Sequence, residues 1–194
     1  MYMKKSYLFL ADGFEEIEAL TTIDVMRRAE MPVATVSIND NARVTGAHGV
    51  IVTADEVIAQ VDLSDAEWLI CPGGMPGASN LAACPKLTAA LVAQAQAGKN
   101  VAAICASPAV VLGPLGILKG REAVCYPGME SGMKEAKVQY NQAVAIDGNI
   151  ITGNGPSAAN PFALAIVAHS AGEDVARRVA EGMLLYEGHY HFYF

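Results

Sequence analysis

Cys105 stands where a buried apolar run ends, and small residues flank it: Ala103 two positions before and Ser107 two positions after. A nucleophile elbow is a sharp strand-to-helix turn that presents a reactive side chain, and it tolerates only small residues at these positions. At such a turn the helix dipole favours a thiolate, and the backbone N–H of Ala106 is free to bind an oxyanion. The same pattern also fits a buried cysteine that acts as a small hydrophobic residue. The local pattern leaves both interpretations open.

Glu18 is a second candidate for chemistry because Ile17 and Leu20 place it beside the apolar side of a predicted helix. A buried carboxyl has a raised pKa, so it can hold a proton or pass one to a neighbour. Acidic residues are also favoured in the first turn of a helix, which is sufficient to explain Glu15 and Glu16. For Glu18 both interpretations stand.

Pro72-Gly73-Gly74 follows another buried run and can supply backbone N–H groups to an anion held near Cys105. An ordinary tight turn is the alternative. The stretch does not match the Gly-x-Gly-x-x-Gly fingerprint, which argues against dinucleotide binding.

Composition narrows the class of protein. The chain has 194 residues, of which 53% are hydrophobic and 17% charged, enough for one sizeable core. The net charge of −7 disfavours binding to nucleic acid. The four cysteines form no Cys-x-x-Cys pair, and a reducing cytoplasm fits them best. Residues 101–118 lack charge, but prolines and glycines interrupt them, so we expect no membrane span.

The elements that must position these residues alternate along the chain. Ile17, Leu20, Ile23, Val25 and Met26 give the first helix a predicted buried stripe. Uniformly apolar strands between helices predict an α/β fold, with a flavodoxin-like, doubly wound, mostly parallel sheet covered by helices on both faces. Strands are expected at 6–11, 32–38, 50–52 (within a hairpin), 68–71, 100–104, 123–125 and 144–152, and helices at 15–29, 84–97, from 106 onward, 156–171 and 173–186.

Five segments of the chain, taken together and in order, resemble the ThiJ/PfpI superfamily, in the branch of the parkinsonism-associated deglycase (DJ-one). The similarity extends from about Lys5 to about Leu185, so residues 1–194 are expected to form one domain with an aromatic tail at about 187–194. The segments are 11–18 (Ala-Asp-Gly-Phe-Glu-Glu-Ile-Glu), 24–29, 72–74, 102–108 (Ala-Ala-Ile-Cys-Ala-Ser-Pro) and 162–167.

The resemblance implies roles for individual residues. Cys105 matches the family's reactive cysteine, and Glu18 matches the acid that hydrogen-bonds this cysteine and lowers its pKa. Gly74 and Ala106 match the backbone donors of the anion pocket. Family members are usually homodimers, and Arg28 matches a position that can approach the partner's pocket. The remaining positions expected to line the pocket are Gly73, Tyr126 and Pro156.

The resemblance also implies an activity: conversion of small oxoaldehydes such as methylglyoxal without glutathione, or removal of early glycation adducts, with no metal or organic cofactor. The alternatives are an oxidative-stress sensor whose cysteine becomes a sulfinate, and a redox-regulated chaperone. Ala106 stands where the protease-like branch has histidine, so peptidase activity is not expected. His169 lacks the following Glu of an amidotransferase triad. Tyr126 stands where several relatives have a histidine, and a phenol is a poor general base near neutral pH.

The aromatic tail contains two histidines, His189 and His191, whose spacing can place both rings on one side of an extended segment. Two ligands without a third make a weak metal site, so no metal is expected. The tail is expected instead to pack on a groove or on a partner subunit.

Overall fold

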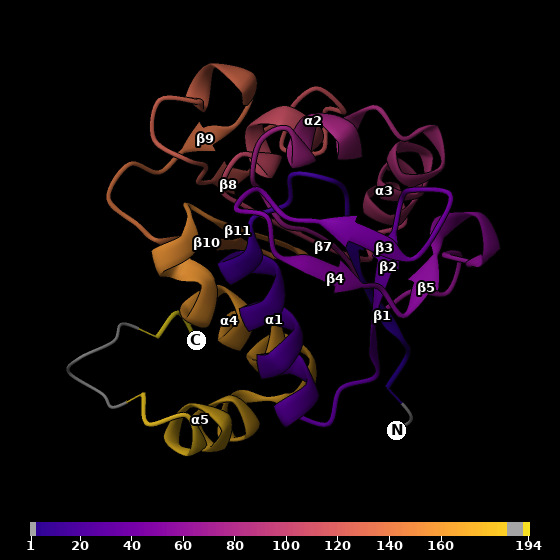
Figure 1. The fold of residues 1–194 in the computed structure, drawn as a ribbon. Coiled ribbons are helices and arrows are strands. Elements are labelled where there is room, and N and C mark those ends of the chain that lie inside the picture. The colour runs from indigo at the N-terminus through magenta and orange to yellow at the C-terminus, as the bar shows by residue number, and fades with distance from the viewer. Residues whose placement is uncertain (1–2, 186–191) are drawn as a thin grey trace.

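A seven-stranded sheet forms the centre of the computed structural model, which describes residues 3–185 and 192–194 (Figure 1). Every neighbouring pair of strands is parallel except β10 with β11. This order confirms the predicted flavodoxin-like, doubly wound α/β fold. Across the sheet the strands are β10 (Val144–Asp147), β11 (Ile150–Gly153), β7 (Asn100–Ile104), β6 (Trp68–Cys71), β1 (Ser6–Leu10), β2 (Val33–Ser37) and β5 (Glu56–Val57).

Side chains of the central strands alternate between two hydrophobic clusters, because successive residues of a strand point to opposite faces. In β1, Tyr7 and Phe9 belong to one cluster, whereas Leu8 and Leu10 belong to the other. Both faces are therefore buried, which explains why the strands read as continuous apolar runs.

Helices cover both faces of the sheet, as Figure 1 shows. The face that carries Leu8 and Leu10 packs against α1 (Glu16–Arg28), α4 (Ala159–Ala171) and α5 (Glu173–Gly182). The opposite face packs against α3 (Pro85–Gln96), and the short α2 (Gly77–Ala82) contributes to both clusters.

The smaller elements lie in the connections between the larger helices and the strands of the central sheet. The predicted hairpin is present as β3 (Arg43–Thr45) paired with β4 (Ile51–Thr53). A second small sheet pairs β8 (Glu122–Ala123) with β9 (Lys137–Val138). The remaining turns of helix are η1 (Ile58–Gln60), the π-helix η2 (Pro108–Leu112), η3 (Glu130–Gly132) and η4 (Pro156–Ala158).

Two of the expected elements are wrong. The single strand expected at 144–152 is a β10–β11 hairpin, because the chain reverses at Gly148, whose φ of +60° is a glycine conformation. The helix expected from residue 106 is only the five-residue η2, because Gly113, Pro114 and Gly116 follow it and stop propagation. A macrodipole from this segment therefore gives little support to a thiolate at Cys105.

The buried face of α1 also differs from the expected stripe. Ile17 and Leu20 are exposed, whereas Glu18 and Thr22 are fully buried. Ile23, Val25 and Met26 are buried as predicted. The helix is therefore rotated so that a carboxyl faces the sheet and two large apolar side chains face outward.

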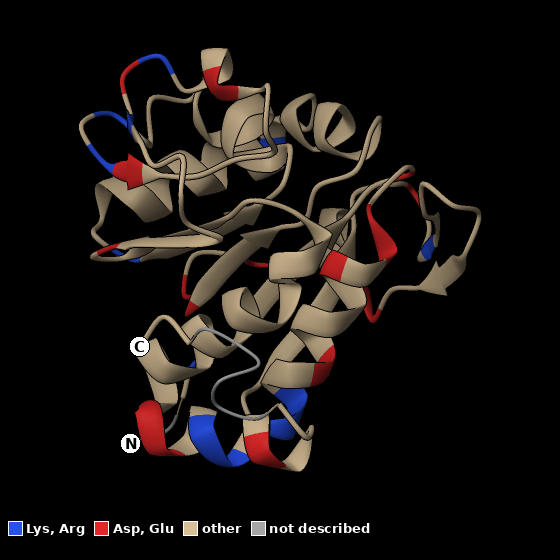
Figure 2. Cartoon of the chain, turned by 90° about the vertical axis from the view of Figure 1, so that its left-hand side faces the viewer, with Lys and Arg blue, Asp and Glu red and all other residues tan. Residues whose placement is uncertain are grey.

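The surface is of mixed charge, and the helices are short. In Figure 2, α5 shows acidic and basic residues together, with Arg177 and Arg178 between Asp174 and Glu181. That mixture does not make a basic stripe of the kind that phosphate backbones require.

None of the helices in residues 3–185 and 192–194 combines the length and apolar character needed to cross a bilayer.

Candidate active site

Cys105 is the first residue after β7, and the chain turns sharply there. Its φ of +64° is in the left-handed region that non-glycine residues rarely adopt. Its own N–H donates to the carbonyl of Gly153, 2.9 Å away on the neighbouring strand β11, and this bond helps to hold the turn. A strained backbone at a strand end is the geometry of a nucleophile elbow.

Two backbone N–H groups converge on the Cys105 sulfur. One belongs to Gly74, in the loop after β6, and the other belongs to Ala106, the next residue along the chain. Gly74 has a φ of +86°, and a Cβ added there would lie 2.5 Å from the Glu15 nitrogen, so only glycine fits. The structure thus brings together the two predicted anion donors at one atom.

Glu18 lies beside the same sulfur, in the first turn of α1. Its side chain is fully buried, and its Oε2 accepts a hydrogen bond of 2.8 Å from the Gly73 N–H. Within the described chain its Oε1 has no hydrogen-bond partner. Gly73 is pressed against both reactive groups, because a Cβ added there would lie 2.9 Å from Sγ of Cys105 and 2.8 Å from Oε2 of Glu18.

Burial controls the protonation of this pair. Removal from water raises the pKa of Glu18 to about 7, against the smaller lowering effects of the Cys105 and Gly73 hydrogen bonds. Burial also raises the pKa of the Cys105 thiol to about 12, and the charge of an ionised Glu18 adds to that rise, whereas the Gly74 and Ala106 N–H groups lower it. A protonated Glu18 can instead donate to the thiolate. The lowering of the thiol pKa that the family resemblance implied therefore requires the protonated carboxyl.

Tyr126 also adjoins this turn, because its N–H donates to the carbonyl of Cys105 at 2.8 Å. Its half-exposed ring lies next to Gly155, where an added Cβ would be 3.6 Å from Cδ2 of the ring. Pro156, the next residue, begins η4 and is half-buried. The role of Pro156 in lining the pocket stays a prediction.

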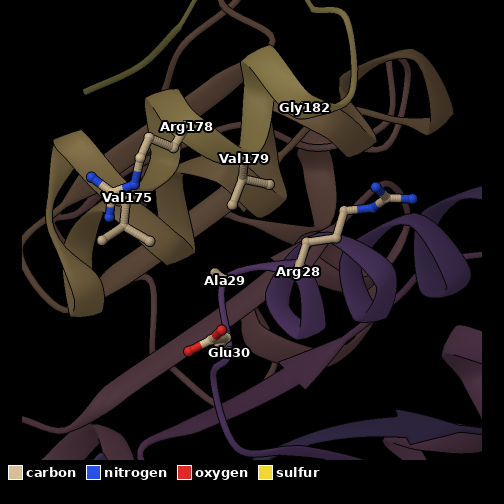
Figure 3. A pocket seen from close by; sticks show the side chains of 7 residues that line it. All are labelled: Arg28, Ala29, Glu30, Val175, Arg178, Val179 and Gly182. Atoms are coloured by element: carbon tan, nitrogen blue, oxygen red, sulfur yellow. The ribbon is translucent and has the colours of Figure 1, made fainter.

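Arg28, another predicted site residue, does not lie at the Cys105 turn. It is at the end of α1, ten residues beyond Glu18, where its Nε bonds Asp24 at 2.6 Å. A helix rises about 1.5 Å per residue, so about 15 Å of helix separates the two. Figure 3 shows Arg28 beside a different hollow, between the end of α1 and α5, which Val179 and Gly182 also line. Its approach to a partner's pocket stays a prediction.

A second polar cluster occupies the start of α1. Oε1 of Glu16 accepts a hydrogen bond of 2.6 Å from the backbone N–H of His48. Oε2 of Glu16 pairs with Nδ1 of the His48 ring at 2.7 Å. Glu15 caps the helix through a 2.7 Å bond from the Glu18 N–H. Glu15, Glu16 and His48 have possible ligand atoms within 4.8 Å of one another, but the hydrogen bonds just described already engage these side chains. Sequence reasoning explained Glu16 only as a helix-start residue and did not predict its pairing with His48.

The tail packs on its own chain where it is described. Phe192, Tyr193 and Phe194 contact the cluster formed by α1, α4 and α5, and the Tyr193 hydroxyl accepts from the Ala143 N–H at 3.0 Å. These three residues therefore pack on their own chain, and packing of the tail on a partner subunit stays a prediction. His189 and His191 lie outside the described residues.

The fold and the site together define a class of doubly wound α/β proteins that place a cysteine in a sharp turn beside a buried carboxyl. Residues 4–169 match the DJ-1/PfpI family, and the chain belongs to that family. This confirms the resemblance found in the five sequence segments.

Relatives and a solved structure agree with this assignment. Protein DJ-1 homolog B of Arabidopsis thaliana is 35% identical over 91% of this chain and 40% of its own length, so the chain spans less than half of that relative. Glutathione-independent glyoxalase DJR-1.2 of Caenorhabditis elegans is 35% identical over 86% of this chain and 89% of its own. The structure of oxidized Toxoplasma gondii DJ-1 has a TM-score of 0.88 and 37% identity, covering 93% of this chain and 98% of that one.

Proposed function

We propose that this protein is a cofactor-independent glyoxalase, which converts small 2-oxoaldehydes such as methylglyoxal into 2-hydroxy acids without glutathione. One observation carries the proposal: Sγ of Cys105 lies beside a buried carboxyl whose pKa is raised to about 7, and beside two backbone donors in one turn. The naming of a C. elegans relative as a glutathione-independent glyoxalase supports it.

The first step forms a carbon–sulfur bond. The Cys105 thiol gives its proton to Glu18, and the thiolate attacks the aldehyde carbon. The N–H groups of Gly74 and Ala106, which act on the sulfur, are proposed to bind the developing oxyanion. Protonation of that oxygen by Glu18 gives a hemithioacetal and leaves Glu18 as a carboxylate.

The second step moves a proton between adjacent carbons. Glu18 removes the hydrogen of the former aldehyde carbon as a proton, and a water molecule protonates the ketone oxygen to give an enediol and hydroxide. Glu18 then delivers its proton to the former ketone carbon, while the other hydroxyl gives its proton to the hydroxide and regenerates water. The product is a thioester, and no electrons leave the substrate. A pKa of about 7 suits a group that must take and return a proton near neutral pH. Water then cleaves the carbon–sulfur bond and restores the thiol.

The test is lactate formation from methylglyoxal in the absence of glutathione. We expect saturable turnover by the wild type, and loss of turnover in both Glu18→Gln and Cys105→Ala. No turnover by the wild type rejects the proposal. Full turnover by Cys105→Ala rejects the covalent mechanism.

A second candidate is an oxidative-stress sensor, favoured by the same two N–H donors, which can stabilise a negatively charged sulfinate on Cys105. Peroxide supplies the oxygen atoms and is reduced to water. The sensor is supported if mild peroxide adds two oxygens to Cys105 alone, as read by intact-mass spectrometry. Oxidation spread over Cys71, Cys84 and Cys125 counts against it. A redox-regulated chaperone is a further alternative, and passive holding of unfolded clients would survive Cys105→Ala.

We also propose that the protein is a homodimer. Ile17 and Leu20 on α1, with Val50 and Ile51 on the hairpin, are large apolar side chains left exposed next to the Glu18 turn. Apolar surface of this kind marks an interface. Sedimentation analysis is expected to give two chains for the wild type and one for Ile17→Asp. A monomeric wild type contradicts the proposal.

A further inference from the structure

Ser107 is a polar residue buried next to the reactive turn. The sequence pattern used it only as a small residue, yet its side chain is fully buried and its hydroxyl makes a hydrogen bond. Oγ donates to the carbonyl oxygen of Pro72 at 2.5 Å, across 35 residues of sequence. This bond joins the elbow after β7 to the loop after β6.

The peptide unit that Ser107 contacts also contacts Glu18. The Pro72 carbonyl and the Gly73 N–H belong to the same planar trans peptide, so they point in opposite directions. Ser107 donates to one edge of that plane, and the other edge donates to Oε2 of Glu18 at 2.8 Å. A carbonyl that accepts a hydrogen bond polarises its peptide and strengthens the N–H on the other edge as a donor.

The next peptide of the loop reaches the sulfur. Its N–H belongs to Gly74 and donates to Cys105, while the matching N–H on the elbow belongs to Ala106, the residue before Ser107. The Ser107–Pro72 bond therefore closes a ring through both donors and the sulfur between them. The loop is also tied to α1, because the Glu15 N–H donates to the Gly73 carbonyl at 3.0 Å.

We propose that Ser107 is a positioning residue, which fixes the spacing of the Gly74 and Ala106 donors around Cys105 and orients the Gly73 N–H toward Glu18. It touches neither substrate nor the reacting atoms and acts through the Pro72–Gly73 peptide. The inference rests on the proposed function only in taking Cys105 and Glu18 as the reactive pair, and it holds equally for the sensor.

The sign of its effect does not depend on which atom carries the charge. The pair loses its first proton as one unit. If Glu18 carries the charge, a weaker Gly73 donor destabilises it. If Cys105 carries the charge, displacement of the Gly74 N–H destabilises the thiolate in the same way. Removing the hydroxyl therefore moves this deprotonation to higher pH. Glu15 is the other ionisable group that acts on the pair, and its charge opposes ionisation of Glu18 in every variant.

The experiment follows alkylation of Cys105 by iodoacetamide as a function of pH, with peptide mass spectrometry to separate it from the other cysteines. Ser107→Ala is expected to move the midpoint up by about half a pH unit, the size of one neutral hydrogen bond. Ser107→Thr keeps the hydroxyl and is expected to restore the wild-type midpoint.

The matched control is Ser37→Ala at the end of β2. Ser37 is also fully buried, and its hydroxyl donates to a backbone carbonyl, that of Asn41, at 2.7 Å. Its loss should leave the Cys105 midpoint unchanged. If Ser107→Ala does not fold, as judged by circular dichroism, Ser107→Gly takes its place.

A folded Ser107→Ala or Ser107→Gly variant with the wild-type alkylation midpoint overturns the inference. An equal shift of that midpoint in Ser37→Ala overturns it as well. Alkylation requires no aldehyde turnover. If the wild type is inactive but its alkylation midpoint depends on Ser107, the glyoxalase proposal is rejected and this inference is sustained. If the wild type is active but Ser107→Ala leaves the midpoint unchanged, this inference is rejected and the glyoxalase proposal is sustained.

Discussion

Cys71 and Cys105 lie at the ends of neighbouring strands of the same sheet, one inside its strand and one just beyond it, and they differ in the groups that surround the sulfur. Cys71 is the last residue of β6 and lies level with Ala103 of β7, so Cys105 stands two residues further along. Both thiols are shielded from water, and burial raises the pKa of each to about 12. Burial alone accounts for Cys71, whereas Cys105 also has Glu18 and two N–H donors around its sulfur.

The difference teaches that position past the strand end, rather than burial, gathers a carboxyl and two N–H donors around a cysteine sulfur. Inside a strand, backbone N–H groups are used in the ladder. Beyond it, the positive φ of Cys105 turns the chain so that the Ala106 N–H points at the sulfur, and the loop after β6 contributes Gly74. The carboxyl edge is where a doubly wound sheet places its ligand site.

The largest expected effect separates these two cysteines. Cys105→Ala should lower kcat/KM for methylglyoxal by about a thousandfold or more, because the nucleophile is lost. Cys71→Ala, which removes one buried sulfur from the core, should keep turnover in the protein that folds. Steady-state lactate assays on both variants test this. Equal losses in the two variants would erase the distinction.

A methyl group at Gly73 should break the site without touching the reacting atoms chemically. The Cβ of Gly73→Ala would lie 2.5 Å from Cβ of Cys105, so one of the two must move. A displacement near 1 Å costs about a hundredfold in rate. Gly182→Ala is the control, since a Cβ there meets nothing within 4 Å. Turnover by Gly73→Ala at the wild-type level would show that the close approach has no consequence.

The pH dependence of stability should reveal the buried carboxyl. Burial raises the pKa of Glu18 to about 7, above its unfolded value, so its contribution is fully present at acid pH and is lost as pH rises through about 7. Glu18→Gln cannot ionise. Its melting temperature should therefore rise relative to the wild type between pH 5 and pH 8. Thermal unfolding at several pH values measures this, and a constant difference contradicts a raised pKa.

The smallest expected effect concerns Glu16, which lies two residues before Glu18. The pKa of Glu16 is lowered, whereas that of Glu18 is raised. Its hydrogen bonds from His48 outweigh burial and lower its pKa, while the carboxylate raises the pKa of His48. The pair stabilises the fold where Glu16 is ionised and His48 is protonated, so its contribution is lost as pH falls through the lowered pKa of Glu16 and as pH rises through the raised pKa of His48. NMR titration should show the His48 pKa falling in Glu16→Gln, and an unchanged titration would show that the pair is absent in solution.

Much of this architecture was predictable from sequence for a simple reason. Continuous apolar runs between helical patterns specify a parallel sheet, and a parallel sheet specifies its ligand edge. Cys105, Glu18 and Gly74 stand just after such runs, so their meeting followed from topology.

The errors have equally physical origins. Hydrophobic periodicity placed Ile17 and Leu20 in the core, but they are exposed while Glu18 is buried, which suits a functional carboxyl and an interface. The role of Ser107 depends on a partner 35 residues away, which no local pattern contains. The β10–β11 hairpin was missed although Gly148 marked its turn.

The most direct test of a covalent glyoxalase is to map where methylglyoxal binds. Rapid quenching and peptide mass spectrometry of the wild type should show one substrate molecule attached to Cys105 as a transient adduct, followed by lactate. Glu18→Gln should show neither the adduct nor lactate, because the first step needs Glu18 to take the thiol proton. Lactate formed by the wild type with no adduct on Cys105, or with adducts only on Cys84 and Cys125, would contradict the account.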